Sequence, residues 1–374
     1  MKKQVTNMEV KKNNRNRIFR YIGRSGTVSN PDIAYELKMS LPTVTQNTKE
    51  LLERGLLEEV GELQSTGGRR AKALAVAADA KQAVGLDITK NHIGLLLTNL
   101  SGQVLAYERI QLPYQDSEEY YRKASELLEN FLKEKKAYRE RILGIGISFP
   151  GIVDLNREMI DHSHILGVDS LPFEAVSRFF PYPCSFLNDA NAGAYAEGMG
   201  AGHQERFFYL SLSNTVGGGI FSNGELVQGD AFRCGEVGHM TIAPEGKLCY
   251  CGKMGCLDAY CSAMCLSDAA GGKLEKFFER LERKEGEAVK LWERYAADLA
   301  VAINNIHMVL DCDIVLGGYV GSCLTWHIQD IWKKVAERTP FMQDIPFVRG
   351  CGHKLGAAAL GAALKVMEVF VEQI

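Results

Sequence analysis

The sequence has no apolar run long enough to cross a membrane, because glycine or charge interrupts every hydrophobic stretch before the roughly 18 residues needed. Lys2 and Lys3 follow Met1 without an apolar segment, so no signal peptide is expected. Ten cysteines in 374 residues are too few for a disulfide scaffold. With 46% hydrophobic and 24% charged residues, the chain is neither disordered nor fibrous. We expect a cytoplasmic globular protein of two or three domains, without a membrane partner.

The net charge of −3 hides an uneven distribution along the chain. Residues 1–72 hold 14 Lys and Arg against 8 Asp and Glu, whereas the remainder holds 29 against 38. A basic head on an acidic body is typical of a nucleic-acid-binding module joined to a sensor or an enzyme. Charge alone favours the simpler interpretation, a solvated basic N-terminal helix.

Residues 12–56 show three short helical patterns joined by tight connections. The first ends at the break from Gly23 to Gly26, and Asn30 is the expected N-cap of the second, with proline following it. Ser40 is the expected cap of the third helix. Two short helices joined by a three-residue turn are typical of a helix-turn-helix.

Two strands, at 56–60 and 72–76, are expected next, and the turn between them contains glycine followed by Arg69 and Arg70. Glycine lets the backbone approach phosphate and arginine neutralises it, so this turn predicts a wing. The third helix would enter the major groove of operator DNA. Base contacts are expected from Thr43 and Gln46, and phosphate contacts from Thr45, Lys49, Arg69 and Arg70. A three-helix bundle for protein contacts is the alternative, but the coincidence of wing, polar helix face and positive charge favours DNA.

The pattern changes at residue 82. Three strands, a helix and a further strand are expected at 83–87, 93–98, 104–110, 117–136 and 142–147. This order is typical of a ribonuclease-H-like half of an actin-type ATPase, and strands at 207–212, 218–221 and 225–227 indicate a second half. The predicted architecture is an α/β chain with a winged helix-turn-helix before a two-lobed actin-like fold. The expected domains are 1–80 for DNA binding, 81–187 with 360–374 for the first lobe, and 188–359 for the second lobe.

Three thiols and one imidazole form a candidate metal site. Cys249, Cys251 and Cys256 lie within eight residues, two glycines allow a tight loop, and His239 lies ten residues upstream. A Cys3His set suits a closed tetrahedral zinc site. Buried free thiols are the alternative, and the spacing favours structural zinc.

Asn188 and Asp189 follow a short strand and open a helix rich in small residues. An aspartate at a strand end that faces a cleft can accept a proton from a sugar hydroxyl. The same pair can also simply cap the helix.

At several segments the chain resembles the ROK family (repressors, open reading frames and sugar kinases), and particularly its transcriptional regulators. The most specific likeness runs from the motif Cys234-Gly-Glu-Val-Gly-His239 through the cysteine loop to Asp258. The wing resembles that of the family's regulators. This resemblance covers essentially the whole chain.

The resemblance implies a sugar site at Asn188, Asp189, Glu236, His239 and Asp258. In the family's kinases the aspartate matching Asp189 is the general base, and the preceding asparagine binds sugar. Asp258 stands where those kinases have glutamate, one methylene longer. A sixth position, His164, falls near a sugar-binding asparagine of the kinases.

Both phosphate loops depart from the kinase pattern. The family's Asp-x-Gly-Gly-Thr is Asp87-Ile-Thr-Lys-Asn91 here, and the second loop keeps three glycines at 217–219 but lacks two others. Glycines let backbone amides approach phosphate oxygens, so ATP binding should be severely weakened. Lys90 could still contact a phosphate.

These observations favour a sugar-responsive DNA-binding regulator, in particular a repressor, whose kinase-like domain binds a sugar or sugar-phosphate effector. A two-fold operator needs two heads, so a homodimer or homotetramer is expected. The alternative is an ATP-dependent, hexokinase-type sugar kinase that also binds DNA, with Asp189 as its general base. A protein-interaction adaptor is the third hypothesis.

Overall fold

The computed structural model describes residues 7–63, 71–200, 206–341, 346–354 and 356–374. Its N-terminal head contains three helices and a hairpin: α1 (Asn7–Ser25), α2 (Asn30–Leu37), α3 (Leu41–Glu53), β1 (Leu57–Glu62) and β2 (Lys72–Val76). Ile18, Ile22 and Val44 are fully buried and hold the helices together. The head therefore has the predicted helix-turn-helix and hairpin. The predicted arginines Arg69 and Arg70 lie outside the described residues.

The helix-turn-helix is fixed by caps, one of which differs from the prediction. Ser29, not Asn30, is the N-cap of α2, and it forms a capping box with Asp32. Asn30 is the first helical residue, and its Oδ1 accepts a hydrogen bond of 3.0 Å from Thr48 of α3. Because Ser29 already accepts a hydrogen bond from the free backbone N–H at the start of α2, the Asn30 side chain is available to join α2 to α3. Ser40 caps α3 as predicted.

The first lobe is built on a five-stranded sheet with the order β10-β6-β3-β4-β5. The strands are β3 (Gln82–Ile88), β4 (His92–Asn99), β5 (Val104–Gln111), β6 (Ile142–Phe149) and β10 (Cys184–Asn188). Helix α4 (Glu118–Glu134) covers one face, beside a small sheet and α5 (Phe173–Ser177). The small sheet comprises β7 (Ile152–Asp154), β8 (Met159–Ser163) and β9 (Val168–Pro172).

The second lobe repeats this topology, with the order β15-β14-β11-β12-β13. Its strands are β11 (Phe207–Leu212), β12 (Val216–Ser222), β13 (Glu225–Val227), β14 (Asp313–Gly317) and β15 (Val348–Gly350). In both sheets an antiparallel meander continues into two parallel strands. This repetition confirms the predicted pair of related lobes.

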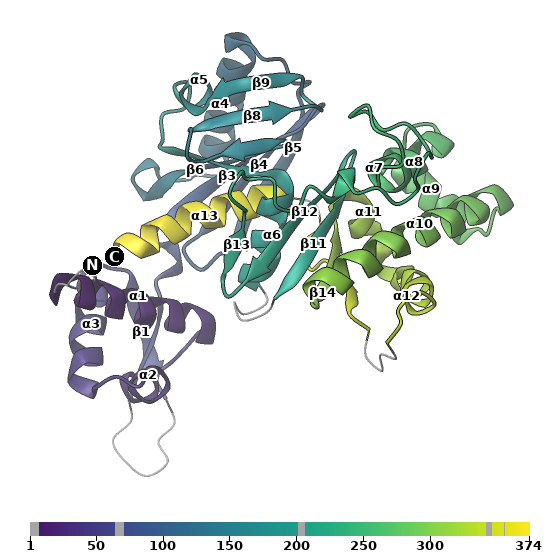
Figure 1. The fold of residues 1–374 in the computed structure, drawn as a ribbon. Helices are drawn as coiled ribbons and strands as arrows, with labels where there is room; N and C mark the ends of the chain where they lie inside the picture. The colour runs from purple at the N-terminus through teal and green to yellow at the C-terminus, as the bar shows by residue number, and fades with distance from the viewer. Residues whose placement is uncertain (1–6, 64–70, 201–205, 342–345, 355) are drawn as a thin grey trace.

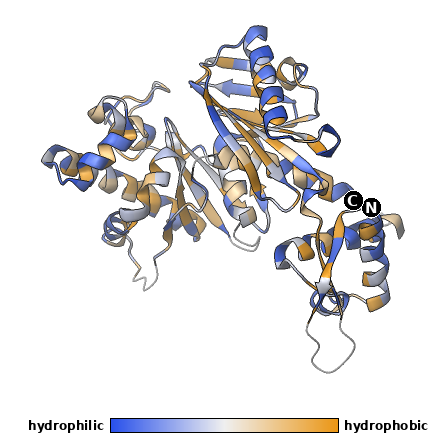
Figure 2. Ribbon diagram, turned by 180° about the vertical axis from the view of Figure 1, so that it is seen from behind, coloured by the Kyte–Doolittle hydropathy of each residue, from blue (hydrophilic) through white to orange (hydrophobic). Residues whose placement is uncertain are grey.

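Helices cover the outer face of the second sheet and form the largest apolar core with it. They are α7 (Asp258–Cys261), α8 (Met264–Ser267), α9 (Leu274–Glu282), α10 (Gly286–Leu310), α11 (Gly318–Cys323) and α12 (Ile328–Ala336). Cys261 lies on α7 and Cys265 on α8, although their spacing of four residues alone would predict one continuous helix. Figure 2 shows hydrophobic residues concentrated on the strands and hydrophilic residues on the outer helices.

Two helices lie between the sheets, α6 (Asp189–Gly200) and α13 (Ala357–Gln373). Their contact is close because small residues line it: a Cβ built on Gly361 would lie 1.7 Å from the carbonyl oxygen of Ala192. On the sheet side, a Cβ on Gly85 of β3 would lie 1.9 Å from the carbonyl oxygen of Ala359. Helix α13 is therefore held at backbone contact on two sides.

The C-terminal end of α13 reaches the N-terminal head (Figure 1). Arg15 of α1 donates to the carbonyl oxygen of Ile374 at 3.2 Å, and Asn16 donates to that of Glu372 at 3.1 Å. Arg20 forms an ion pair with Glu368. One helix therefore joins the space between the lobes to the head. In the described part of the chain, every helix is too short or too polar to cross a membrane.

Candidate functional site

A cleft between the lobes gathers the ends of their parallel strands. Asp87 lies near the end of β3, Ser148 near the end of β6, and Asp189 directly after β10. Residues of the second lobe face them from the ends of β11 and β14, among them Ser213 and Tyr319. The cleft has a volume of about 830 Å³, its open mouth included. Ligands commonly bind at the carboxyl ends of parallel strands in such sheets.

Asp87 and Asp189 form the acidic end of this cleft. The Ser148 hydroxyl donates to Asp87 Oδ1 at 2.8 Å. Burial raises the pKa of Asp87 to about 6; the Ser148 hydrogen bond and Arg109 lower it, while Asp189 raises it. Burial likewise raises the pKa of Asp189, against hydrogen bonds from neighbouring backbone and from Asn188. Asp189 is thus close enough to disfavour ionisation of Asp87.

Asn188 and Asp189 lie at the junction of β10 and α6, where Asn188 makes a capping contact and Asp189 lines the cleft. Asn188 Oδ1 accepts from the Asn191 backbone N–H at 2.9 Å, which is a capping contact at the start of α6. Its amide donates to the carbonyl oxygen of Gly151 at 2.9 Å and to Asp189 Oδ1 at 3.2 Å. Oδ1 of Asp189 also accepts from the Ala190 N–H, whereas Oδ2 has no partner among the described residues. Asn188 is therefore an anchor, and Asp189 presents one oxygen to the cleft.

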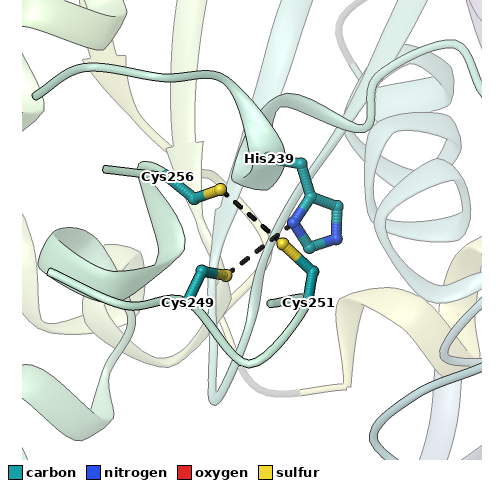
Figure 3. A group of neighbouring side chains, drawn as sticks. All are labelled: His239, Cys249, Cys251 and Cys256. Atoms are coloured by element: carbon teal, nitrogen blue, oxygen red, sulfur yellow. Dashed lines mark hydrogen bonds between the residues drawn. The ribbon is translucent and has the colours of Figure 1, made fainter. Parts of the chain in front are cut away.

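Four potential metal ligands meet at one point of the second lobe (Figure 3). The ligand atoms of His239, Cys249, Cys251 and Cys256 all lie within 4.8 Å of one another. Cys251 Sγ is 3.7 Å from Cys256 Sγ, and Cys249 Sγ is 3.9 Å from His239 Nδ1. Zn–S bonds of about 2.3 Å and Zn–N bonds of about 2.0 Å at tetrahedral angles would give edges of roughly 3.5–3.8 Å. The donor set and its spacing therefore fit a tetrahedral metal ion.

The loop that holds these ligands depends on glycine. Gly252 and Gly255 have positive φ angles of 85° and 77°, and a Cβ on Gly255 would lie 1.9 Å from the carbonyl oxygen of Ala243. Burial lowers the pKa of His239, with smaller contributions from His164 and Lys253. A lowered pKa favours the neutral imidazole, which is the form that binds a metal.

The other predicted effector residues surround this loop in different settings. Glu236 is exposed to solvent. Even so, the protein around its carboxylate raises the pKa of Glu236, and the charge of Asp189 adds to this shift. Asp258 is 5% exposed, and its Oδ2 accepts from the Val216 N–H at 2.6 Å, so one oxygen supports the chain at β12. His164 stacks on Tyr250 at 4.7 Å between ring centres and meets its carbonyl oxygen at 3.0 Å. The first lobe therefore touches the metal loop.

The predicted DNA-contacting residues share one face of α3. Thr45, Gln46 and Lys49 are exposed, while the intervening Asn47 and Thr48 are buried. The Thr43 side chain is only partly exposed, and its Oγ1 lies 2.8 Å from that of Ser40, inside the cap. The structure thus leaves three of the four predicted α3 side chains turned to solvent.

Two family models match this chain. The one described as ROK family matches residues 83–368, and the one described as winged helix-turn-helix DNA-binding matches residues 12–58. The chain belongs to the ROK family.

Relatives of the ROK domain include both repressors and kinases. The xylose repressor of Bacillus spizizenii is 29% identical over 271 residues, 71% of this chain and 70% of that protein. The Escherichia coli protein named DNA-binding transcriptional dual regulator NagC is 29% identical over 68% of this chain and 64% of its own length. A solved ROK family transcriptional regulator, described as a homolog of E. coli MLC protein, covers 97% of both chains with a TM-score of 0.79 and 22% identity. A ROK hexokinase from Thermus thermophilus covers 78% of this chain and 100% of its own, with a TM-score of 0.62 and 27% identity.

The comparisons confirm the predicted fold, a winged helix-turn-helix before a two-lobed ROK domain of the kind found in sugar kinases. Sequence analysis did not single out Arg109, Lys354 or Tyr250 of the ROK domain. Arg109 and Lys354 line the cleft, and the Tyr250 hydroxyl lies 3.4 Å from His239 Nε2. Tyr250 could have been noticed because it separates two of the cysteines. Arg109 and Lys354 carry no local signal, since only the folded chain brings them to Asp87.

Asp87→Asn is expected to stabilise the protein at neutral pH. The pKa of Asp87 rises from 3.8 to about 6 on folding, so the native state binds the proton more tightly than the unfolded state. The ionised carboxylate of Asp87 therefore destabilises the folded protein, an effect that is absent below about pH 4, grows up to pH 6 and stays constant above it. At pH 7 this loss of folding free energy is at most about 3 kcal/mol.

Denaturant unfolding of both proteins at pH 4, 5, 6 and 7 measures this difference in free energy of unfolding. Asp230→Asn, at an exposed position, controls for loss of a charge. A gap between Asp87→Asn and the parent that shrinks as pH rises would contradict the assignment.

Proposed function

We propose that this protein is a cytoplasmic, sugar-responsive transcriptional regulator that represses carbohydrate-utilisation genes. The observation that carries the proposal is the solvent-facing polar side of α3, on a winged head that α13 joins to the ROK cleft. The names of the Bacillus spizizenii and Escherichia coli relatives support it. Loss of glycine from both phosphate loops argues against the kinase alternative, since backbone amides could no longer closely surround a triphosphate.

Operator DNA is the proposed partner of the head. Gln46 would read a base edge in the major groove, and Lys49 and Thr45 would contact phosphates. Thr43 would reach a base only by leaving its contact with Ser40. Arg69 and Arg70 would contact phosphates from the wing. Because one head reads half of a two-fold site, the working form would be a homodimer or homotetramer.

The proposed effector is a sugar or sugar derivative bound in the cleft. Asp189 would accept a hydroxyl hydrogen bond through Oδ2, and Asn188 would hold Asp189 in place. Glu236 and the Nε2 atom of His239 would contact further hydroxyls. Asp258 has one carboxylate oxygen left for this purpose, because the other is bonded to Val216.

Zinc is the proposed metal of the Cys3His group. His239, Cys249, Cys251 and Cys256 would hold it in a closed, structural site, which supplies folding energy and no open position for chemistry. Bonding through Nδ1 would fix the ring and leave Nε2 of His239, which lies 3.4 Å from the Tyr250 hydroxyl, as the nitrogen that could contact the effector. The metal would thereby set the geometry of one effector contact.

Cys251→Ser is expected to lose zinc and to lower the melting temperature of the protein. The variant replaces one thiolate ligand by a hydroxyl, which is a poor zinc ligand. Elemental analysis of purified protein and thermal unfolding measure the two effects. Cys184→Ser in β10, far from the cluster in sequence and topology, is the matched control. Equal zinc content in all three proteins would contradict the site.

Gln46→Ala is expected to weaken binding to the operator by about 1–3 kcal/mol and to have little effect on unrelated DNA, because a base contact carries specificity. Fluorescence anisotropy at fixed salt, on the DNA upstream of the protein's own operon and on a scrambled duplex, measures both affinities. Lys49→Ala provides the contrast: losing a phosphate contact should weaken both duplexes alike and flatten the salt dependence. A Gln46→Ala variant that weakens both duplexes equally would refute the base contact.

Asp189→Asn is expected to leave operator affinity unchanged while raising at least tenfold the sugar concentration that releases the DNA. The amide oxygen of the variant can still accept the backbone hydrogen bond at the start of α6. It accepts a hydrogen bond from a sugar hydroxyl more weakly than the charged carboxylate does. The same anisotropy assay, titrated with a panel of sugars and sugar phosphates, measures release. Loss of operator binding in the absence of sugar would instead assign Asp189 a structural role.

A further inference from the structure

A second cavity lies where the N-terminal head meets the body. It has a volume of about 1200 Å³, its open mouth included, and none of the described residues lines both this cavity and the cleft. Its walls come from α1 and β2 of the head, and from the β4–β5 turn, α6 and α13 of the body. Small organic molecules bind in hollows of comparable size, roughly 300–1,000 Å³. We call this space the junction cavity.

Most side chains that line the junction cavity are apolar. They include Phe19 and Val76 of the head, Leu100 of the β4–β5 turn, Met199 of α6, and Leu364 and Met367 of α13. The two methionines have flexible thioether side chains, which adapt to the shape of a bound hydrocarbon. A sugar would place hydroxyls against this wall without hydrogen-bond partners, which is unfavourable. The wall therefore suits a ligand with a hydrocarbon body.

A glycine of α1 keeps part of the junction cavity open. Gly23 lies inside α1, two residues before its end, where alanine would favour the helix more. A Cβ built on Gly23 would have a single neighbour within 4 Å, the Cγ2 atom of Val76 at 3.9 Å. The described protein thus leaves room for a side chain at this position. Because Gly23 and Val76 both line the cavity, that room belongs to it.

Arg24 adds a positive charge to the lining of the junction cavity. Within the described ranges, its guanidinium has no carboxylate within 4.0 Å, whereas the neighbouring Arg20 pairs with Glu368. Arg24 also borders a polar groove that contains Glu225 and Glu372, and neither comes within ion-pair distance of it. Burial and the charge of Arg20 lower the pKa of Arg24, against the opposing effect of Glu368. An anion placed beside Arg24 would relieve this unfavourable setting.

We infer that the junction cavity is a second ligand site, which binds a small monocarboxylate with an aliphatic or aromatic body. The hydrocarbon would lie against Phe19, Leu364 and Met367, and the carboxylate would lie beside Arg24. A neutral hydrocarbon would leave Arg24 unpaired, and an inorganic anion would leave the apolar wall uncovered. The inference goes beyond the proposed function, because it concerns another cavity and another class of ligand.

A ligand in this cavity would contact the head and the body at the same time. Its walls include α1 and β2 on one side and α6 and α13 on the other. A ligand that binds only when these walls are together stabilises the folded protein by mass action. Binding should therefore raise the melting temperature and slow hydrogen exchange of the backbone amides in α1.

Isothermal titration of the full chain with matched probes tests the class of ligand. The probes are hexanoate, octanoate and 3-phenylpropanoate, the alcohols octanol and 3-phenylpropanol, octylamine, and glucose. We expect octanoate or 3-phenylpropanoate to bind about tenfold or more tightly than its alcohol, with octylamine weaker still. Octanoate should bind more tightly than hexanoate, by up to about fourfold for each added methylene group. Alcohols that match their carboxylates, or no binding of either carboxylate at millimolar concentration, would overturn the inference.

Two variants test the place of binding. Gly23→Leu should weaken octanoate binding about tenfold or more, because the leucine side chain fills the cavity and also favours the helix. Gly286→Leu, at an open position at the start of α10, is its matched control and should leave the affinity unchanged. Octanoate binding that Gly23→Leu leaves unaltered would overturn the inference.

Arg24→Gln should remove the preference for the carboxylate over the alcohol. Arg283→Gln, at an exposed position at the end of α9, is the control for loss of a positive charge and should keep the preference. An Arg24→Gln variant that still prefers octanoate to octanol would overturn the assignment of the anionic end.

Photolabelling of the parent protein locates the ligand even if a variant fails to fold. An octanoate analogue with a diazirine on its chain should label peptides from residues 19–24 and 360–371, and excess octanoate should suppress the labelling. Asp189→Asn, altered in the other cavity, should be labelled to the same extent. Labelling confined to other segments would overturn the inference.

These measurements contain neither DNA nor a sugar effector, so they separate the inference from the proposed function. Failure of the carboxylates to bind would leave the sugar-responsive regulator in place. A protein that binds octanoate in the junction cavity but no operator would support this site and refute the regulator.

Discussion

Close packing of α13 between the two sheets is the constraint on which the rest of the structure depends. Gly85 and Gly361 are positions where any side chain would enter the backbone of a neighbouring element. The helix can neither rotate nor slide without a clash, so it moves together with the sheet and with α6. Its start borders the cleft and its end contacts α1. The helix therefore connects the cleft to the head as one rigid element.

Local patterns predicted those parts of the molecule that local physics determines. The cysteine loop was predictable because three ligands within eight residues need only a tight turn with glycines, and the structure places Gly252 and Gly255 at positive φ. The helix-turn-helix was predictable from its caps and apolar spacing. The prediction of Asn30 as N-cap was wrong by one residue, because Ser29 is the cap. Both residues are good caps, and the Asp32 carboxylate decides between them by closing a capping box on Ser29.

Tertiary placement determines what the sequence could not predict. The segment 273–296 is rich in charged residues, and its composition by itself predicts solvated helices, yet α9 and α10 each bury an apolar face, including Phe277 and Trp292, in the core of the second lobe. Their charges lie on the opposite faces, a pattern that composition hides. Arg109 and Lys354 show the same limit for the site: they are 245 positions apart in the sequence, and only the folded chain brings both into the cleft that contains Asp87.

The junction between the head and α13 is suited to a small change in position. It combines polar contacts with apolar packing. The polar contacts are Arg15 to the Ile374 carbonyl, Asn16 to the Glu372 carbonyl, and the ion pair of Arg20 with Glu368, and one apolar core contains both Phe19 of α1 and Val371 of α13. Hydrogen bonds and partly exposed ion pairs of this kind contribute roughly 0.5–1.5 kcal/mol each, and water can replace them. A shift of the head that keeps the apolar packing and exchanges only these polar contacts would cost a few kcal/mol, a gap that differential binding of one small ligand could reverse. The apolar core beneath, with Gly361 at backbone contact, keeps the moving helix intact.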